Sequence, residues 1–217
     1  MKDSNLENRN EYKQEELIFT FVSDISPLVF SNIITDDNRS TKNDLSGLDQ
    51  VIMLEVGEYM DEVFNLEFVR AGIRIQVALM QKDLENGLIS KEDIFNADFY
   101  KEIYEEEEEY FDEDDIDDYD DEYWEEYYDY DFDDERFQAK IRRIAVGTLA
   151  GRITTDNPSQ INGLTGYEQA LYYIAHLLPA ENEEEREKHL EKIARKVQAY
   201  LIDFEGGYDL ISMINKY

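Results

Sequence analysis

Residues 66–87 read LEFVRAGIRIQVALMQKDLENG, and this stretch shows most clearly which fold class the chain belongs to. Its apolar residues recur with a period near 3.6, which is typical of an amphipathic α-helix. Asn65 is a suitable N-cap, and Gly87 is the residue type that commonly takes the left-handed conformation after a helix end. The stretch therefore predicts a helix over Leu66 to Asn86 that packs one face against a core.

The segments on either side carry the same kind of pattern. The residues from Ser90 to Asp93 resemble a capping box, which predicts that a helix begins there. Pro is favoured at the first helical position, so Ser26-Pro27 is predicted to begin a short helix reaching about Ile34. Further helices are predicted from a cap at Asp44 or Ser46 to Val63, over Phe137 to Ile153, from a cap at Thr165 to Pro179, and over Glu181 to Ile202.

The predicted fold is mainly α, a helical bundle of about six to eight helices, because no βαβ alternation or hairpin signal appears. Composition divides the chain into a mobile polar leader (residues 1–13), an N-terminal helical region (14–101), an acidic tract (102–135) and a C-terminal helical region (136–217). With 217 residues, of which 42% are hydrophobic, the two helical regions are expected to form one domain.

The acidic tract, residues 102–135, holds 22 acidic and 10 aromatic side chains and no Lys or Arg. The whole chain has a net charge of −32, and the 183 residues outside the tract account for only −10 of it. Such a run is commonly disordered. However, Ile116, Tyr119, Tyr123, Tyr127 and Tyr130 fall within an arc of about 80° on a helix, so an ordered helix over roughly Asp112 to Phe132 stays open. In helical form the tract carries one carboxylate per roughly 2.3 Å, close to the charge spacing of about 1.7 Å in duplex DNA.

Charge and composition exclude several classes of function. An acidic surface repels nucleic acids and anionic membranes, whose binding depends on Lys and Arg. The chain has no Cys, and no apolar stretch is long and unbroken enough for a signal peptide or a membrane span. A cytoplasmic location is therefore expected.

Motifs for catalysis or metal binding are weak. His176 and His189 lack the spacing of a metal-binding pair, and the Asp-x-Asp runs of the tract lack the glycine of a calcium loop. Glu183-Glu184-x-x-Glu187 resembles half of the Mg²⁺ motif of all-α nucleotide pyrophosphohydrolases, but the second half is missing. No catalytic residue, metal site or cofactor is predicted. Four basic residues follow the tract and are expected to neutralise part of it: Lys140, Arg142, Arg143 and Arg152.

The sequence predicts a non-enzymatic acidic protein that occupies a basic groove of a partner. The most specific form is a nucleic-acid mimic that inhibits a DNA- or RNA-binding protein, as in anti-defence inhibition. One alternative is an acidic chaperone or assembly factor for a basic client, and another is an all-α Mg²⁺-dependent nucleotide hydrolase. The predicted partner-binding residues are Glu105, Glu106, Glu107, Glu108, Glu109, Asp112, Glu113, Asp114, Asp115, Asp117, Asp118, Tyr119, Asp120, Asp121, Glu122, Tyr123, Trp124, Glu125, Glu126, Tyr127, Tyr128, Asp129 and Asp131.

Overall fold

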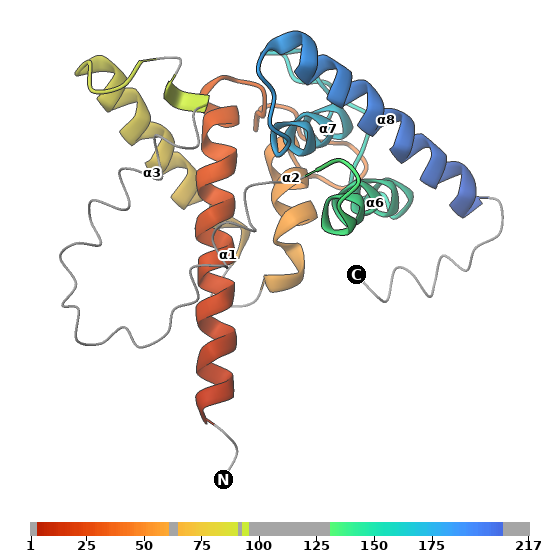
Figure 1. Ribbon diagram of the computed structural model, residues 1–217, viewed down its shortest axis with the longest axis horizontal. Helices are drawn as coiled ribbons and strands as arrows, with labels where there is room; N and C mark the ends of the chain where they lie inside the picture. The colour runs from red at the N-terminus through yellow and green to blue at the C-terminus, as the bar shows by residue number, and fades with distance from the viewer. Residues whose placement is uncertain (1–3, 61–64, 91–92, 96–130, 206–217) are drawn as a thin grey trace.

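A computed structural model of the protein describes residues 4–60, 65–90, 93–95 and 131–205 (Figure 1). All regular structure in these ranges is helical, which confirms the mainly α fold. Six α-helices lie there, at the low end of the predicted number. The elements are α1 (Ser4–Phe30), α2 (Gly47–Glu55), the 3₁₀-helix η1 (Gly57–Tyr59), α3 (Leu66–Glu85), the 3₁₀-helix η2 (Asp93–Phe95), α6 (Glu135–Leu149), α7 (Gly166–His176) and α8 (Glu183–Glu205).

The helices form two three-helix groups that meet in the middle of the molecule. Helix α1 packs along α3, α6 packs along α8, and α2 packs on α7 between the two pairs (Figure 1). Fully buried side chains from both groups build one continuous core, for example Ile25, Ile52, Ile144 and Ile174. The rings of Tyr173 on α7 and Phe21 on α1 make a T-shaped contact with a centroid distance of 5.8 Å. The two helical regions therefore share a single core.

The loops that precede α2 and α7 have matching sequences. Residues 34–50 and 153–169 align without a gap at a separation of 119, and nine of their 17 positions are identical. The helix ends before these loops match as well, because Asn32 (φ 58°) and Gly151 (φ 70°) both take the left-handed conformation. We call α1 to α3 the first repeat and α6 to α8 the second repeat. The fold is thus an internal duplication of a three-helix unit.

Reciprocal hydrogen bonds relate the two repeats by an approximate two-fold axis. Oε1 of Gln169 accepts from the Thr35 N–H at 2.9 Å, and Oε1 of Gln50 accepts from the Thr154 N–H at 2.8 Å. Each glutamine also donates to the hydroxyl of the same threonine, at 3.1 and 3.2 Å. Such mutual contacts between equivalent surfaces define an isologous interface.

The asparagines and glycines of the two loops extend this reciprocity. Nδ2 of Asn43 donates to the Gly151 carbonyl at 2.9 Å and so provides a hydrogen bond for a carbonyl just after the end of α6. Nδ2 of Asn162 does the same for the end of α1, donating to the Asn32 carbonyl at 2.8 Å. A Cβ at Gly47 would overlap the amide of Gln169 from the other repeat. The close approach of the loop backbone to the other repeat therefore requires a glycine, which has no Cβ.

Several local predictions are confirmed by the structure. Asn65 caps α3 by accepting from the Phe68 N–H, and Gly87 follows that helix with a φ of 70°. Thr165 caps α7 in a capping box with Glu168. The side chain of Ser90 likewise accepts from the Asp93 N–H at 3.3 Å. These caps are formed by hydrogen bonds between residues close in sequence, so they depend little on the tertiary structure.

Two predicted helix boundaries were wrong. Pro27 does not begin a helix but lies inside α1, which runs to Phe30. The apolar face of α1, including Ile25 and Leu28, is fully buried on both sides of the proline, and we infer that this packing outweighs the missing N–H. Helix α2 ends at Glu55, where the chain passes into a 3₁₀-helix beginning at Gly57, so it does not continue to Val63.

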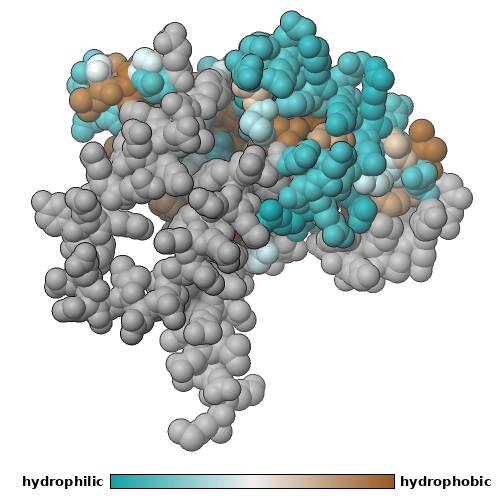
Figure 2. All heavy atoms as spheres, in the orientation of Figure 1, coloured by the Kyte–Doolittle hydropathy of each residue, from teal (hydrophilic) through white to brown (hydrophobic). Residues whose placement is uncertain are grey.

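Helix α8 separates a buried apolar side from a charged outer side. Ile193 and Val197 are fully buried, whereas two ion pairs lie on the exposed side. Lys188 contacts Glu184 at 2.7 Å, and Arg195 contacts Glu191 at 2.5 Å. In Figure 2 hydrophilic residues gather over the part of the surface that α8 covers. This face thus has the balanced charge of an ordinary surface helix.

Candidate functional site

The predicted partner-binding residues fall almost entirely outside the described residues. Of that set only Asp131 is described, where it is exposed beside the beginning of α6. Residues 105–129, which include the other predicted partner-binding residues, lie outside the described ranges. In sequence, residues 96–130 connect the last described element of the first repeat to the second repeat. The tract is therefore an insertion between the repeats of a duplication.

The last residues of the acidic tract shape the start of α6. Asp134 is the N-cap, and its side chain accepts from the Arg136 N–H at 2.7 Å. This hydrogen bonding lowers the pKa of Asp134. The Asp131 carbonyl accepts from the Asp134 N–H at 3.0 Å and closes the preceding turn. Carboxylates at the N-terminus of a helix also interact favourably with its dipole, so this end of the tract has a structural role.

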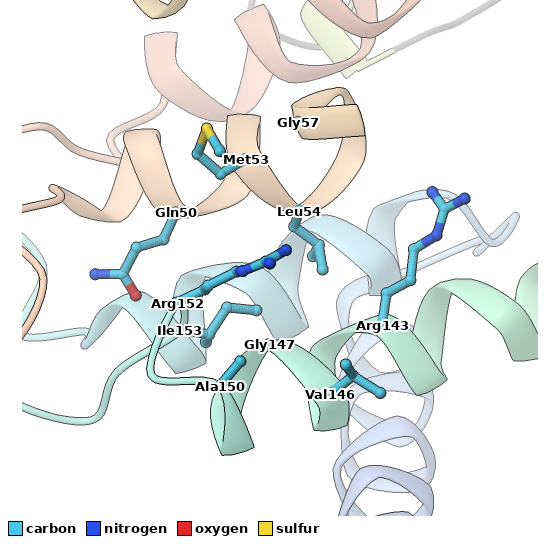
Figure 3. Close-up of a pocket in the computed structure, with 10 residues that line it drawn as sticks. All are labelled: Gln50, Met53, Leu54, Gly57, Arg143, Val146, Gly147, Ala150, Arg152 and Ile153. Carbon is cyan, nitrogen blue, oxygen red and sulfur yellow. The ribbon is translucent and has the colours of Figure 1, made fainter. Parts of the chain in front are cut away.

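The four basic residues that follow the tract do not form one patch. Lys140 makes an ion pair with Glu55 on α2, and both side chains are largely buried. The guanidinium of Arg142 lies 5.3 Å from the ring centroid of Tyr200 on α8. Arg143 and Arg152 border a pocket between α2 and α6 (Figure 3). Lys140 thus has a carboxylate of the core as a partner, and most of the tract that it was expected to neutralise lies outside the described residues.

A cluster of three ionisable residues lies where α1, α2 and α6 meet. Burial raises the pKa of Asp24 to about 7, the positive charge of Lys140 opposes this shift, and the negative charge of Glu55 adds to it. Glu55 is 5% exposed, and its Oε2 has no hydrogen-bond partner among the described residues. Two carboxylates with one ammonium group would carry an excess negative charge, so a proton on Asp24 relieves the repulsion.

Replacing Asp24 with Asn is expected to change how stability depends on pH. The raised pKa keeps a proton on Asp24 in the folded chain that the unfolded chain releases near pH 4, so the residue lowers the free energy of unfolding as the pH rises to about 7. The Asp24→Asn variant lacks this loss. Its stability relative to the parent should therefore be greater at about pH 8 than at about pH 4.5.

Urea unfolding at both pH values measures this difference. Asp203→Asn on the exposed side of α8 is the matched control, and it should shift the two measurements equally. Equal differences for Asp24→Asn at the two pH values would show that Asp24 has no raised pKa in the folded chain.

A pocket lies between α2 and α6, at the interface of the repeats. Its volume is about 240 Å³, and its walls are mainly apolar, formed by Met53, Leu54, Val146 and Ile153. In Figure 3 the side chain of Arg152 lies across the pocket between the two helices. Gln50 also borders it, but its amide is bound to Thr154. The pocket thus combines an apolar interior with guanidinium groups.

The two histidines and the glutamate motif show no metal-site geometry. Nδ1 of His176 lies 2.8 Å from the Tyr172 carbonyl one helical turn away, and burial lowers its pKa to about 4. Nδ1 of His189 is buried without a hydrogen-bond partner among the described residues. Glu183, Glu184 and Glu187 lie exposed in the first turns of α8. Within the described ranges, no group of three or more His, Asp or Glu residues is arranged to hold a metal ion.

The polar residues of the two loops were missed as a functional unit by reasoning from the sequence. Their role is to join the repeats: Asp156 accepts from the Ser40 hydroxyl at 2.8 Å and from the Thr41 N–H at 2.9 Å. The Thr41 hydroxyl donates to the same carboxylate at 2.6 Å, and together these hydrogen bonds hold the pKa of Asp156 well below its usual range. A comparison of the sequence with itself at a separation of 119 would have found them.

Comparisons with protein-family models, curated proteins and solved structures find no match for this chain. None of the helices among the described residues combines the length and the apolar character required to cross a membrane. The function of the protein is therefore inferred from the chemistry of the chain itself.

Proposed function

We propose that the protein is a non-enzymatic acidic binding protein whose acidic tract occupies a basic groove of a partner protein. The observation that carries the proposal is the 22 acidic residues in 34 positions, with no basic residue among them. Like-charged neighbours destabilise a compact state, and a strongly basic partner relieves that repulsion. The most specific form of the proposal is a mimic of a nucleic acid.

The surplus of charge in the tract exceeds what the chain itself can neutralise. The four basic residues that follow it are far fewer than its 22 acids, and Lys140 already pairs with Glu55. On α8, Lys188 and Arg195 are paired with glutamates of their own helix. The tract therefore keeps a large net negative charge for a partner.

The duplication supports a binding role for the inserted tract. Direct hydrogen bonds join the repeats, such as those between Asp156 and Ser40 and between Asn162 and Asn32. A connector between two repeats that join in this way has no need of 22 acids for folding. The described helices thus act as a scaffold that carries the tract.

Binding is expected to weaken steeply with salt, because the attraction is electrostatic. Affinity for the partner should be highest near 50 mM salt and should fall by at least about tenfold by 500 mM, since the Debye length drops below about 8 Å above 0.15 M. A pull-down from native lysate at low salt, with mass spectrometry, identifies the partner. Titration of the purified pair by calorimetry then measures the salt dependence. An affinity that hardly changes over this range would contradict the proposal.

Competition with duplex DNA and RNA separates mimicry from client shielding. A mimic occupies the nucleic-acid groove, so the partner bound to this protein should no longer bind its nucleic acid. A chaperone client should instead be transferred to its nucleic acid when that is added.

A further inference from the structure

The two-fold relation between the repeats allows the pocket to be compared with the equivalent position on the other side of the axis. Hydrogen bonds at the helix ends set the alignment, because the N–H groups of Arg152 and Ile153 donate to the Gly147 carbonyl as those of Ile33 and Ile34 donate to the Leu28 carbonyl. Gly147 on α6 therefore corresponds to Leu28 on α1. By the same separation of 119, Leu54 on α2 corresponds to Tyr173 on α7.

Across the two-fold axis, larger side chains fill the equivalent position between α1 and α7. Leu28 is 1% exposed and Tyr173 is 2% exposed, and the Tyr173 ring packs against Phe21. Between α2 and α6 the smaller Leu54 and Gly147 stand at this position, and a pocket of about 240 Å³ is open. The fold can therefore accommodate side chains in this space, because they fill it between α1 and α7. The pocket is therefore specific to the α2–α6 side of the axis and not a packing defect that the fold imposes.

The same comparison shows where the pocket gains its charge. Arg152 corresponds to Ile33, and Arg143 corresponds to Asp24. The backbone of Arg152 is fixed, because its carbonyl accepts from Nδ2 of Asn43 at 2.8 Å. Among the described residues no acidic side chain forms an ion pair with Arg152, whose side chain crosses the pocket (Figure 3). A guanidinium presents several N–H donors in a plane, which suits a carboxylate or a phosphate.

We propose that the pocket between α2 and α6 binds a small organic anion. Arg152 holds its carboxylate or phosphate group, and its apolar part packs on Met53, Leu54, Val146 and Ile153. The volume of about 240 Å³ lies below the range of roughly 300–1,000 Å³ for drug-sized ligands, so the ligand is small. Arg152 provides local attraction in a protein whose net charge of −32 otherwise repels anions. This site is independent of the acidic tract.

Binding of simple probes to the full chain tests the site. Benzoate and phenyl phosphate each combine an aromatic ring with an anionic group, and comparing them shows whether the site prefers a carboxylate or a phosphate. Acetate and inorganic phosphate lack the ring, and benzyl alcohol lacks the charge. In calorimetry or saturation-transfer NMR, at least one ring-bearing anion should bind saturably, at least about tenfold more tightly than the other three probes. Absence of saturable binding by both ring-bearing anions overturns the proposal.

Two variants locate the binding in the pocket. Arg152→Gln changes an exposed residue and should weaken the bound anion by at least about tenfold, whereas Arg195→Gln on α8 should leave its affinity unchanged. Leu54→Tyr places at the pocket the residue type of its counterpart Tyr173 on α7 and should abolish binding by filling it. Circular dichroism checks the fold of each variant, and if Leu54→Tyr does not fold, Arg152→Gln decides alone. Equal affinities of Arg152→Gln and the parent would refute the proposed site.

Discussion

Replacing residues 105–130 with a short Gly/Ser linker is expected to leave the helical scaffold folded and to abolish partner binding. The replacement removes 17 acidic residues and changes the net charge from −32 to −15. The affinity should fall by at least about a hundredfold, because the charges that attract the partner are gone. The linker ends before Asp131, since Asp131 and Asp134 form the turn and the N-cap that begin α6.

Circular dichroism and thermal unfolding measure the fold of this variant, and calorimetry measures its affinity for the partner. A matched control keeps the length and the aromatic residues of 105–130 and changes only its 17 acids to Asn or Gln. Loss of binding in both variants assigns the affinity to charge. Retained affinity in the linker variant would assign binding to the scaffold, and extensive loss of helicity would make the tract part of the core.

Removing either reciprocal glutamine is expected to destabilise the protein strongly. Gln169→Ala leaves the buried N–H of Thr35 without its partner, and Gln50→Ala does the same to the N–H of Thr154. Since an unsatisfied buried polar group costs about 1–3 kcal/mol, each variant should lower the free energy of unfolding by roughly 3 kcal/mol. Urea unfolding provides the measurement.

Because the interface is symmetric, the effects of the two glutamine variants can be compared directly. The two single variants should lose similar stability, and the double variant should lose less than their sum, because both side chains serve one contact between the repeats. Gln81→Ala is the control, since the side chain of Gln81 is exposed and donates to the surface residue Glu85, and its effect should stay within about 0.5 kcal/mol. Changes that small for Gln50→Ala and Gln169→Ala would mean that the reciprocal hydrogen bonds contribute little to joining the repeats.

Neither proposal about binding depends on the other. Loss of the acidic tract should not weaken anion binding at Arg152, and Arg152→Gln should not affect the salt dependence of partner binding. The tract is a connector of residues 102–135, whereas the pocket is built from α2 and α6 of the scaffold. Each can therefore fail without the other.

The sequence by itself determined the helical character, several helix ends and the location of the surplus charge. A period of 3.6 in residues 66–86 and the caps at Asn65 and Thr165 act within a few residues, so they are readable without the fold. Charge is likewise a sum over residues. The 22 acids of the tract limit the class of partner whichever conformation they adopt.

Only the tertiary structure decided which distant residues meet. Pro27 stays inside α1 because long-range packing buries the face on both sides of it, and Lys140 pairs with Glu55 across 85 positions of the chain. The pocket beside Arg152 is lined by residues of α2, of α6 and of the chain just after α6, and no local pattern reports that these residues meet. Contacts of this kind depend on the close packing of segments far apart in sequence, and their energies are not properties of any single segment.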